Sequence, residues 1–357
     1  MRCPTLSELP AAPPGKTGWP WTVESPPAPE AMADGSPWPR VSIVTPSYNQ
    51  GRFIEETIRS VLLQGYPNLE YIIMDGGSTD GTVDIIRKYE PWLAYWVSEK
   101  DRGQSHAVNK GWQRATGEIL AYLNSDDLYL PGAIHRAVEA LSQNQTAALV
   151  YSDGIWIDEA GGFLKLQQSG PLDARQMLTG ASPFGIPQPT AFMRRDAVQM
   201  VGWLDESLHM AMDFDLWVKL ALRNPLHYVN GPSLAMLRVH ADMKTAVRML
   251  EDRVCTLSAL ERGLSDPHCP SGLSTMGNKA YARLCLDLAI MHLQDLKVGL
   301  SKEYFIRALR SSPTETLNLS LNRFLVQSYR TVIPAGVQHW VRRLRGIEEQ
   351  SYSHVRY

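Results

Sequence analysis

Short apolar runs alternate with longer stretches of helical periodicity between residues 41 and 153. The runs predict strands at 41–46, 69–75, 93–98, 118–124 and 147–153. Apolar residues spaced three and four apart predict helices at 52–64, 81–89, 105–115 and 131–143. Strands that alternate with helices of this length form βαβ units. We therefore expect an α/β fold with a mostly parallel sheet flanked by helices.

The pattern changes on both sides of this region. Residues 1–39 are rich in proline and poor in aliphatic residues, which predicts an extended arm. Beyond residue 153 the pattern indicates a loop that enters a strand at 186–195, a helix at 212–223 with an acidic first turn, and two short strands within 227–240. After residue 243 it is mostly helical. We expect three parts: the arm at 1–39, a catalytic domain at 40–242 and a C-terminal helical appendage at 243–357.

Polar residues stand where the predicted strands end. Thr45, Asp75, Glu99, Asp101 and Asp126 all occupy such positions. In open parallel sheets, ligands bind beyond the carboxyl ends of the strands. The sequence thus predicts a binding site at this edge, with carboxylates as its main polar groups.

Composition narrows the function classes. The formal net charge of −2 argues against a nucleic-acid-binding protein that works by bulk positive charge. The chain contains no run of 18 apolar residues and no apolar signal core at its N-terminus. Four scattered cysteines predict no disulfide framework. We expect a cytoplasmic protein with no nucleic-acid partner.

Two long stretches carry a resemblance to a known family. They read VSIVTPSYNQGRFIEETIRSVLLQGYPNLEYIIMDGGSTDGT and EKDRGQSHAVNKGWQRATGEILAYLNSDDLYLPGAI. Together they resemble the catalytic core of family 2 glycosyltransferases, over about residues 40–242. The resemblance implies the GT-A fold, a Rossmann-like arrangement that binds nucleotide sugars.

The resemblance implies a nucleoside pocket at the first strands. Thr45, Pro46 and Tyr48 would form one wall of it, and Asn109 would lie near the sugar and phosphate. Asp75 matches the aspartate that accepts a hydrogen bond from the N3–H of uracil. The alternative for Asp75 is a plain turn residue before the glycines that follow it.

The resemblance also implies a metal site at NSDD, residues 124–127. The family usually has Asp-x-Asp there, whereas this chain has Asn124 in place of the first carboxylate. We expect Asp126, Asp127 and His240 to bind Mn²⁺ or Mg²⁺, which take oxygen ligands and neutralise diphosphate charge. Asp127 could instead cap the helix that follows, and His240 could be structural.

The catalytic base is expected in MDFDLW, residues 212–217. Asp213 matches the aspartate that removes the proton of the acceptor hydroxyl, although Met212 replaces the glutamate that often precedes it. Asp215 would face away from it on a helix. The alternative is that both acids only favour the helix N-terminus.

These residues imply an inverting glycosyltransferase that uses a nucleotide-diphosphate sugar, with UDP as the expected nucleotide. By resemblance, the acceptor is a glycan or a lipid-linked glycan. Residues 316–347 hold five arginines and no acid, which suggests peripheral contact with a membrane. The alternatives are a non-catalytic nucleotide-sugar-binding protein of the same fold and a nucleotidyltransferase.

Overall fold

A seven-stranded sheet forms the centre of the fold in the computed structural model, which describes residues 2–180, 182, 185–243 and 248–320. In spatial order its strands are β10 (Leu226–Tyr228), β6 (Leu149–Tyr151), β9 (Phe192–Arg194), β4 (Ile119–Tyr122), β1 (Val41–Ser47), β2 (Leu69–Asp75) and β3 (Tyr95–Ser98). Neighbouring strands run parallel except for β9, which is antiparallel to β4 and β6. The predicted α/β fold with a mostly parallel sheet is confirmed.

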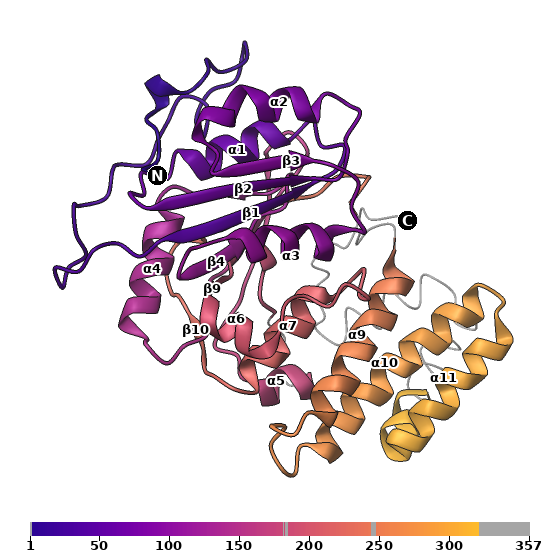
Figure 1. Cartoon of the computed structure of the whole chain (residues 1–357). Helices are drawn as coiled ribbons and strands as arrows, with labels where there is room; N and C mark the ends of the chain where they lie inside the picture. The colour runs from indigo at the N-terminus through magenta and orange to yellow at the C-terminus, as the bar shows by residue number, and fades with distance from the viewer. Residues whose placement is uncertain (1, 181, 183–184, 244–247, 321–357) are drawn as a thin grey trace, which may run out of the picture. The chain divides into compact units, whose positions relative to one another are not determined.

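Helices cover both faces of the sheet (Figure 1). One core joins β1 and β2 to α1 (Ile54–Leu62), α2 (Thr82–Tyr89) and α4 (Ala133–Gln143). The other joins them to α3 (Gln104–Arg114), α6 (Arg195–Val201) and α7 (Met212–Ala221). Because successive side chains of a strand point to opposite faces, Ile43 belongs to the first core and Val44 to the second. The continuous apolar run in β1 therefore reflects burial on both faces.

A second sheet has four strands, in the order β5 (Leu128–Tyr129), β11 (Ala235–Arg238), β7 (Gly154–Ile157) and β8 (Phe163–Gln167). Of these, only β11 is among the predicted strands. Its pairing with β5 and β7 brings the chain after residue 235 beside the chain after residue 124. The second sheet thus brings the two predicted site segments, one after residue 124 and one after residue 235, close to each other.

The N-terminal arm packs along the domain through buried tryptophans and one buried arginine. Trp21 and Trp38 are buried, and the indole N–H of Trp19 donates to the carbonyl of Tyr129 at 2.8 Å. Arg59 of α1 is 1% exposed and donates to the carbonyls of Pro10, Pro20 and Trp21 at 2.8–3.1 Å. The arm is therefore held both by apolar packing of its tryptophans and by these hydrogen bonds from α1.

The chain divides into two compact units, Met1–Gly277 and Asn278–Tyr357. The first includes α5 (Ala174–Thr179) and α9 (Met249–Ser265), which pack with α7. Helix α10 (Ser274–Gln294) begins just before the division, and α11 (Val298–Ser311) lies in the second unit. In that unit Arg307 donates to the hydroxyl of Tyr281 at 2.6 Å. The described C-terminal region is helical, as predicted, while the expected boundary at residue 243 stays a prediction.

We predict that Arg59→Met lowers the free energy of unfolding by about 3 kcal/mol, since a buried donor to several carbonyls is lost. Urea denaturation followed by circular dichroism measures this. The matched control is Arg87→Met, which removes only an exposed ion pair with Asp84 and changes stability by less than about 0.5 kcal/mol. Equal effects of the two substitutions would show that Arg59 does not anchor the arm.

Candidate active site

Three adjacent strands end in register at one edge of the large sheet. Ser47 of β1 pairs with Asp75 of β2, and Asp75 pairs with Ser98 of β3. The buried carboxylate of Asp75 accepts hydrogen bonds from the Ser98 hydroxyl at 2.6 Å and from the backbone N–H of Ser78 at 2.9 Å. Asp75 therefore orders the loop after β2 and fixes the strand ends against each other.

Asp75, Tyr48 and Asp101 lie around Gly76. A Cβ on Gly76 would lie 2.8 Å from Oδ2 of Asp101 and 3.4 Å from the ring of Tyr48, so these two side chains pack closely over the glycine. Tyr48 is 62% exposed, although large aromatic side chains are usually buried. The structure thus brings together Tyr48, Asp75 and Asp101 and leaves the tyrosine ring open to a ligand. The sequence indicates for Asp101 only a position at the end of a strand.

The other predicted nucleoside residues lie in more enclosed positions. Thr45 is fully buried, and its hydroxyl lies 3.0 Å from the hydroxyl of Tyr71. Pro46 is buried in the same strand. Asn109 is buried on α3, where its amide donates to the carbonyl of Leu204 at 2.9 Å and accepts from its N–H at 3.1 Å. The amide of Asn109 thus holds the loop before α7, and its contact with nucleotide stays a prediction.

Asp126, which follows β4, contacts His240, which follows β11. Nε2 of His240 lies 2.9 Å from Oδ2 of Asp126, and Nδ1 of His240 is buried with no hydrogen-bond partner in the part of the chain that the structure describes. A carboxylate oxygen and an imidazole nitrogen that face each other at this distance can both bind one divalent cation. No cluster of three or more His, Cys, Asp or Glu side chains arranged for a metal occurs among the described residues. A cation at Asp126 and His240 would thus need ligand atoms from substrate or water.

Asp127 lies deeper than Asp126. Its Oδ1 accepts from the backbone N–H of Arg238 at 3.0 Å, and its Oδ2 accepts from the amide of Asn124 at 3.2 Å. Burial, followed by the neighbouring charge of Asp126, raises the pKa of Asp127 well above its ordinary value. The structure therefore shows Asp127 as the residue that ties the turn at 124–127 to β11.

The buried guanidinium of Arg238 completes this connection. It donates to the carbonyl of Asp126 at 3.0 Å and to the carbonyl of Glu159 at 2.9 Å. It also forms an ion pair with Glu56 of α1 at 2.9 Å, with the arginine side chain 1% exposed. Arg238 thus holds the backbone of Asp126 in place through the hydrogen bond to its carbonyl. Sequence reasoning missed Glu56, because nothing local distinguishes it from the other acids of α1.

The amide at position 124 has a structural reason. Asn124 donates to Oε1 of Gln188 at 3.0 Å and accepts from the amide of Gln104 at 2.6 Å. A carboxylate accepts but cannot donate, whereas an amide does both. Asn124 thus links α3 to the segment before β9, which explains the departure from the family's usual aspartate.

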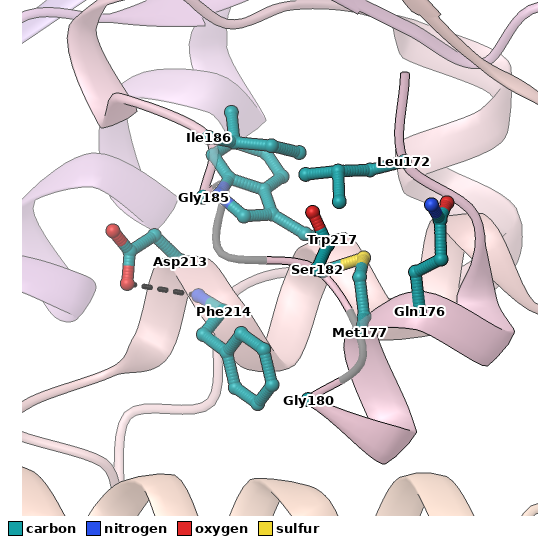
Figure 2. A pocket seen from close by; sticks show the side chains of 10 residues that line it. All are labelled: Leu172, Gln176, Met177, Gly180, Ser182, Gly185, Ile186, Asp213, Phe214 and Trp217. Atoms are coloured by element: carbon teal, nitrogen blue, oxygen red, sulfur yellow. Dashed lines mark hydrogen bonds between the residues drawn. The ribbon is translucent and has the colours of Figure 1, made fainter. Parts of the chain in front are cut away.

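Asp213 lies in the first turn of α7 and borders a pocket of about 310 Å³ (Figure 2). Ala211, two residues earlier, has a left-handed φ of 52°, a strained conformation for a residue with a side chain. Burial, followed by the nearby charge of Asp252, raises the pKa of Asp213 above its ordinary value. After burial, Asp213 and Asp127 are the charges that raise the pKa of Tyr122, so both carboxylates lie near this one phenol.

Asp215 has different surroundings, as its spacing from Asp213 predicted. It is 2% exposed and forms ion pairs with Lys219 at 2.7 Å and with Arg262 at 3.2 Å. Arg262 also pairs with Asp205, so this network ties α7 to α9 and to the loop before α7. Asp215 thus stabilises the helix that carries Asp213.

Solved structures of the same fold include two that contain nucleotide sugars. A mannosyltransferase from Pyrobaculum calidifontis in complex with GDP-Man and Mn²⁺ aligns with a TM-score of 0.54 and 23% identity, over 87% of this chain and 88% of that one. S. aureus TarS in complex with UDP-GlcNAc aligns with a TM-score of 0.53 and 15% identity, over 83% and 93%. These likenesses confirm the GT-A fold.

Sequence comparisons identify the family. Residues 42–202 match the family described as Glycosyl transferase family 2. An uncharacterized glycosyltransferase of Mycobacterium tuberculosis is 32% identical over 52% of this chain and 70% of its own length. Chondroitin synthase of Escherichia coli is 28% identical over 60% of this chain and 31% of its own length. The chain therefore belongs to glycosyltransferase family 2 and is a glycosyltransferase.

Proposed function

We propose that the protein transfers one sugar from a UDP-sugar to an acceptor hydroxyl by a single, metal-assisted displacement that inverts the anomeric carbon. The observation that carries this proposal is the meeting of Asp126 with His240 at the edge where Asp75 and Tyr48 also lie. A non-catalytic binding protein would have no need of Asp213, which stands in a strained helix start with a raised pKa.

The nucleoside would lie on Tyr48, with its base edge toward Asp75 and Asp101. Stacking on an exposed aromatic ring tolerates any base, so the choice of base falls to the hydrogen-bonding groups. The carboxylates of Asp75 and Asp101 accept hydrogen bonds, and uracil offers its N3–H. Thr45 and Pro46, which are buried in β1, would support the nucleoside-binding surface from within the sheet.

Asp126 and His240 would hold Mn²⁺ or Mg²⁺, with Asp127 beneath them as the third predicted ligand. A divalent cation bound there would supply positive charge to the diphosphate as it leaves. Arg238 and Asp127 hold the backbone of this turn, so its ligand atoms are arranged before substrate binds. Diphosphate oxygens and water would complete the coordination.

Asp213 would act as the general base. As the acceptor oxygen bonds to the anomeric carbon, the bond from that carbon to the phosphate oxygen breaks, and UDP leaves with the electron pair. The proton of the acceptor hydroxyl passes to Asp213. The raised pKa suits this role, because a base whose pKa approaches the working pH binds the proton more effectively.

The acceptor is proposed to be a glycan or a lipid-linked glycan. A putative teichuronic acid biosynthesis glycosyltransferase of Bacillus subtilis, 37% identical over 34% of this chain and 52% of its own length, supports a polysaccharide acceptor. No helix among the described residues is both long enough and apolar enough to cross a bilayer. Membrane contact through 316–347 stays a prediction, because residues 321–347 lie outside the described residues.

We predict that UDP binds in the presence of Mn²⁺. Asp126→Asn and His240→Gln should each weaken this binding at least about tenfold, which is the lower end of the loss of metal affinity when a group that supports the metal is removed. Calorimetry with UDP, TDP and GDP, with and without Mn²⁺, measures it. Asp242→Asn, an exposed neighbour, is the control and leaves binding unchanged. UDP binding that is equally tight without metal would contradict the metal site.

A second prediction concerns pH. Asp213 must be deprotonated to act, so kcat/KM falls as pH drops through its raised pKa. Asp252→Asn removes the charge that helps to raise this pKa, so the acidic limb shifts to lower pH. Glu251→Gln, the preceding residue with an exposed ion pair, leaves the limb in place. Asp213→Asn lowers kcat by about 10²–10⁴-fold. A limb that survives Asp213→Asn would assign the base elsewhere.

A third prediction tests the support behind Asp126. Glu56→Gln removes the counterion of buried Arg238, which lowers the free energy of unfolding by about 2 kcal/mol and weakens Mn²⁺-dependent binding of UDP. Glu159→Gln is the matched control, since Arg238 contacts its backbone carbonyl and its side chain is half exposed. If both variants bind UDP and Mn²⁺ like the unaltered protein, Arg238 has only a structural role.

A further inference from the structure

The imidazole of His240 has few hydrogen bonds for a group that is proposed to bind a cation. Its side chain is 1% exposed, and its Nε2 lies 2.9 Å from Oδ2 of Asp126. Its Nδ1 is buried and has no hydrogen-bond partner among the described residues. A histidine that binds a metal usually donates its second ring N–H to a carboxylate or a carbonyl, and this bond fixes the orientation of the ring. Within the part of the chain that the structure describes, His240 lacks that second bond.

Cation binding would also replace the hydrogen bond between this imidazole and Asp126. A ring nitrogen that gives its lone pair to a cation cannot at the same time donate a proton to a carboxylate. If Nε2 of His240 binds the cation, the connection to Asp126 passes through that cation. The orientation of the ring then depends on the side chains that pack against it.

Phe53, the residue before α1, packs against the ring of His240. The two ring centroids lie 4.9 Å apart, with an interplanar angle of 43°. Phe53 is 5% exposed. Its backbone N–H donates to the carbonyl of Gln50 at 2.9 Å, and its carbonyl accepts from the N–H of Glu56 at 3.0 Å. The start of α1 therefore fixes the backbone of Phe53, and the buried ring lies on His240.

Two guanidinium groups also contact the ring of Phe53. The guanidinium carbon of Arg52 lies 4.9 Å from the ring centroid, and that of Arg238 lies 5.1 Å from it. The face of an aromatic ring attracts such cations. Arg238 stands two residues before His240, and Arg52 pairs at 2.8 Å with Asp242, two residues after it. Phe53 and its neighbour thus connect the start of α1 to the chain on both sides of His240.

These contacts give a reason for an aromatic residue at position 53. Leucine could fill part of the same space, but it has no flat face to lie against an imidazole and no π-electrons to attract a guanidinium. Helix α1 is held separately by Ile54, Ile58 and Val61, which belong to the hydrophobic core. Loss of the ring should therefore loosen the imidazole of His240 without unfolding the domain.

We propose that Phe53 is a positioning residue for the cation site, and that its ring orients the imidazole of His240 in place of a hydrogen bond at Nδ1. The inference rests on the proposed function, which assigns His240 to Mn²⁺ or Mg²⁺. In this arrangement Phe53 acts on the cation through His240 and not by direct contact.

The test is calorimetry of the full chain with Mn²⁺ and UDP. Phe53→Leu should weaken Mn²⁺-dependent binding of UDP about tenfold, as loss of a group that supports a metal ligand does. Phe53→Met, whose flexible apolar side chain adapts to the space, should do the same and serves if the leucine variant does not fold. Ile58→Val is the matched control, because Ile58 is fully buried in the core on the same helix. It should lower the melting temperature and leave UDP binding unchanged.

A double-substitution cycle separates positioning from a general loss of stability. Because Phe53 acts through the imidazole, Phe53→Leu should weaken UDP binding little further in a protein that already carries His240→Gln. Effects of independent sites would multiply instead. The visible spectrum of bound Co²⁺ gives a second readout, since it reports the geometry of the metal. Phe53→Leu should change this spectrum, and Ile58→Val should not.

Two outcomes would overturn the inference alone. Equally tight Mn²⁺-dependent UDP binding in Phe53→Leu, Phe53→Met and the unaltered protein would show that the ring does not orient His240. Effects that multiply with those of His240→Gln would show that Phe53 supports the site by another route. Absence of Mn²⁺-dependent UDP binding in the unaltered protein would instead refute the proposed function, and the inference with it.

Discussion

The arrangement of the candidate active site depends on one buried guanidinium, that of Arg238. Arg238 carries its charge inside the protein, where it is stable only because Glu56 and three backbone carbonyls receive its hydrogen bonds. Its own backbone N–H holds Asp127, and its strand leads directly to His240. One residue thus connects α1, the turn at 124–127 and the second sheet. Because an unpaired buried charge is so costly, these three elements have little freedom to move apart, and the ligand atoms of Asp126 and His240 keep their mutual position.

Much of the fold could be predicted from the sequence because the large sheet is buried on both faces. Its strands are apolar runs between amphipathic helices, and β1, β2 and β3 lie where periodicity places them. The second sheet could not be predicted in the same way. β5 has only two residues, which is too short for a period, and β8 is an exposed edge strand in which Phe163 and Leu164 point to opposite faces. Only tertiary pairing defines these strands.

The candidate active site likewise combines features that the sequence predicts with features that it does not. Asp75 and Asp126 follow strands, so their place at the carboxyl edge could be predicted from topology. The contact of Arg238 with Glu56 joins residues 182 positions apart, and no local pattern indicates it. Asn109 illustrates the opposite case: a polar residue expected at the ligand also donates a hydrogen bond to the backbone carbonyl of Leu204, which no sequence pattern indicates. Sequence spacing shows which residues reach the edge, but not which of them the protein uses for its own hydrogen bonds.

Asp213 and Asp215 show how one helix separates a chemical role from a structural one. They are two residues apart, so they face different sides of α7. Asp215 forms ion pairs with two cations, Lys219 and Arg262. Among the described residues no cation pairs with Asp213; it borders a pocket, and burial with a nearby carboxylate raises its pKa. Divergent surroundings of this kind assign acid–base roles in enzymes. The paired acid fixes the helix against α9, while Asp213 on the same helix stays beside the pocket.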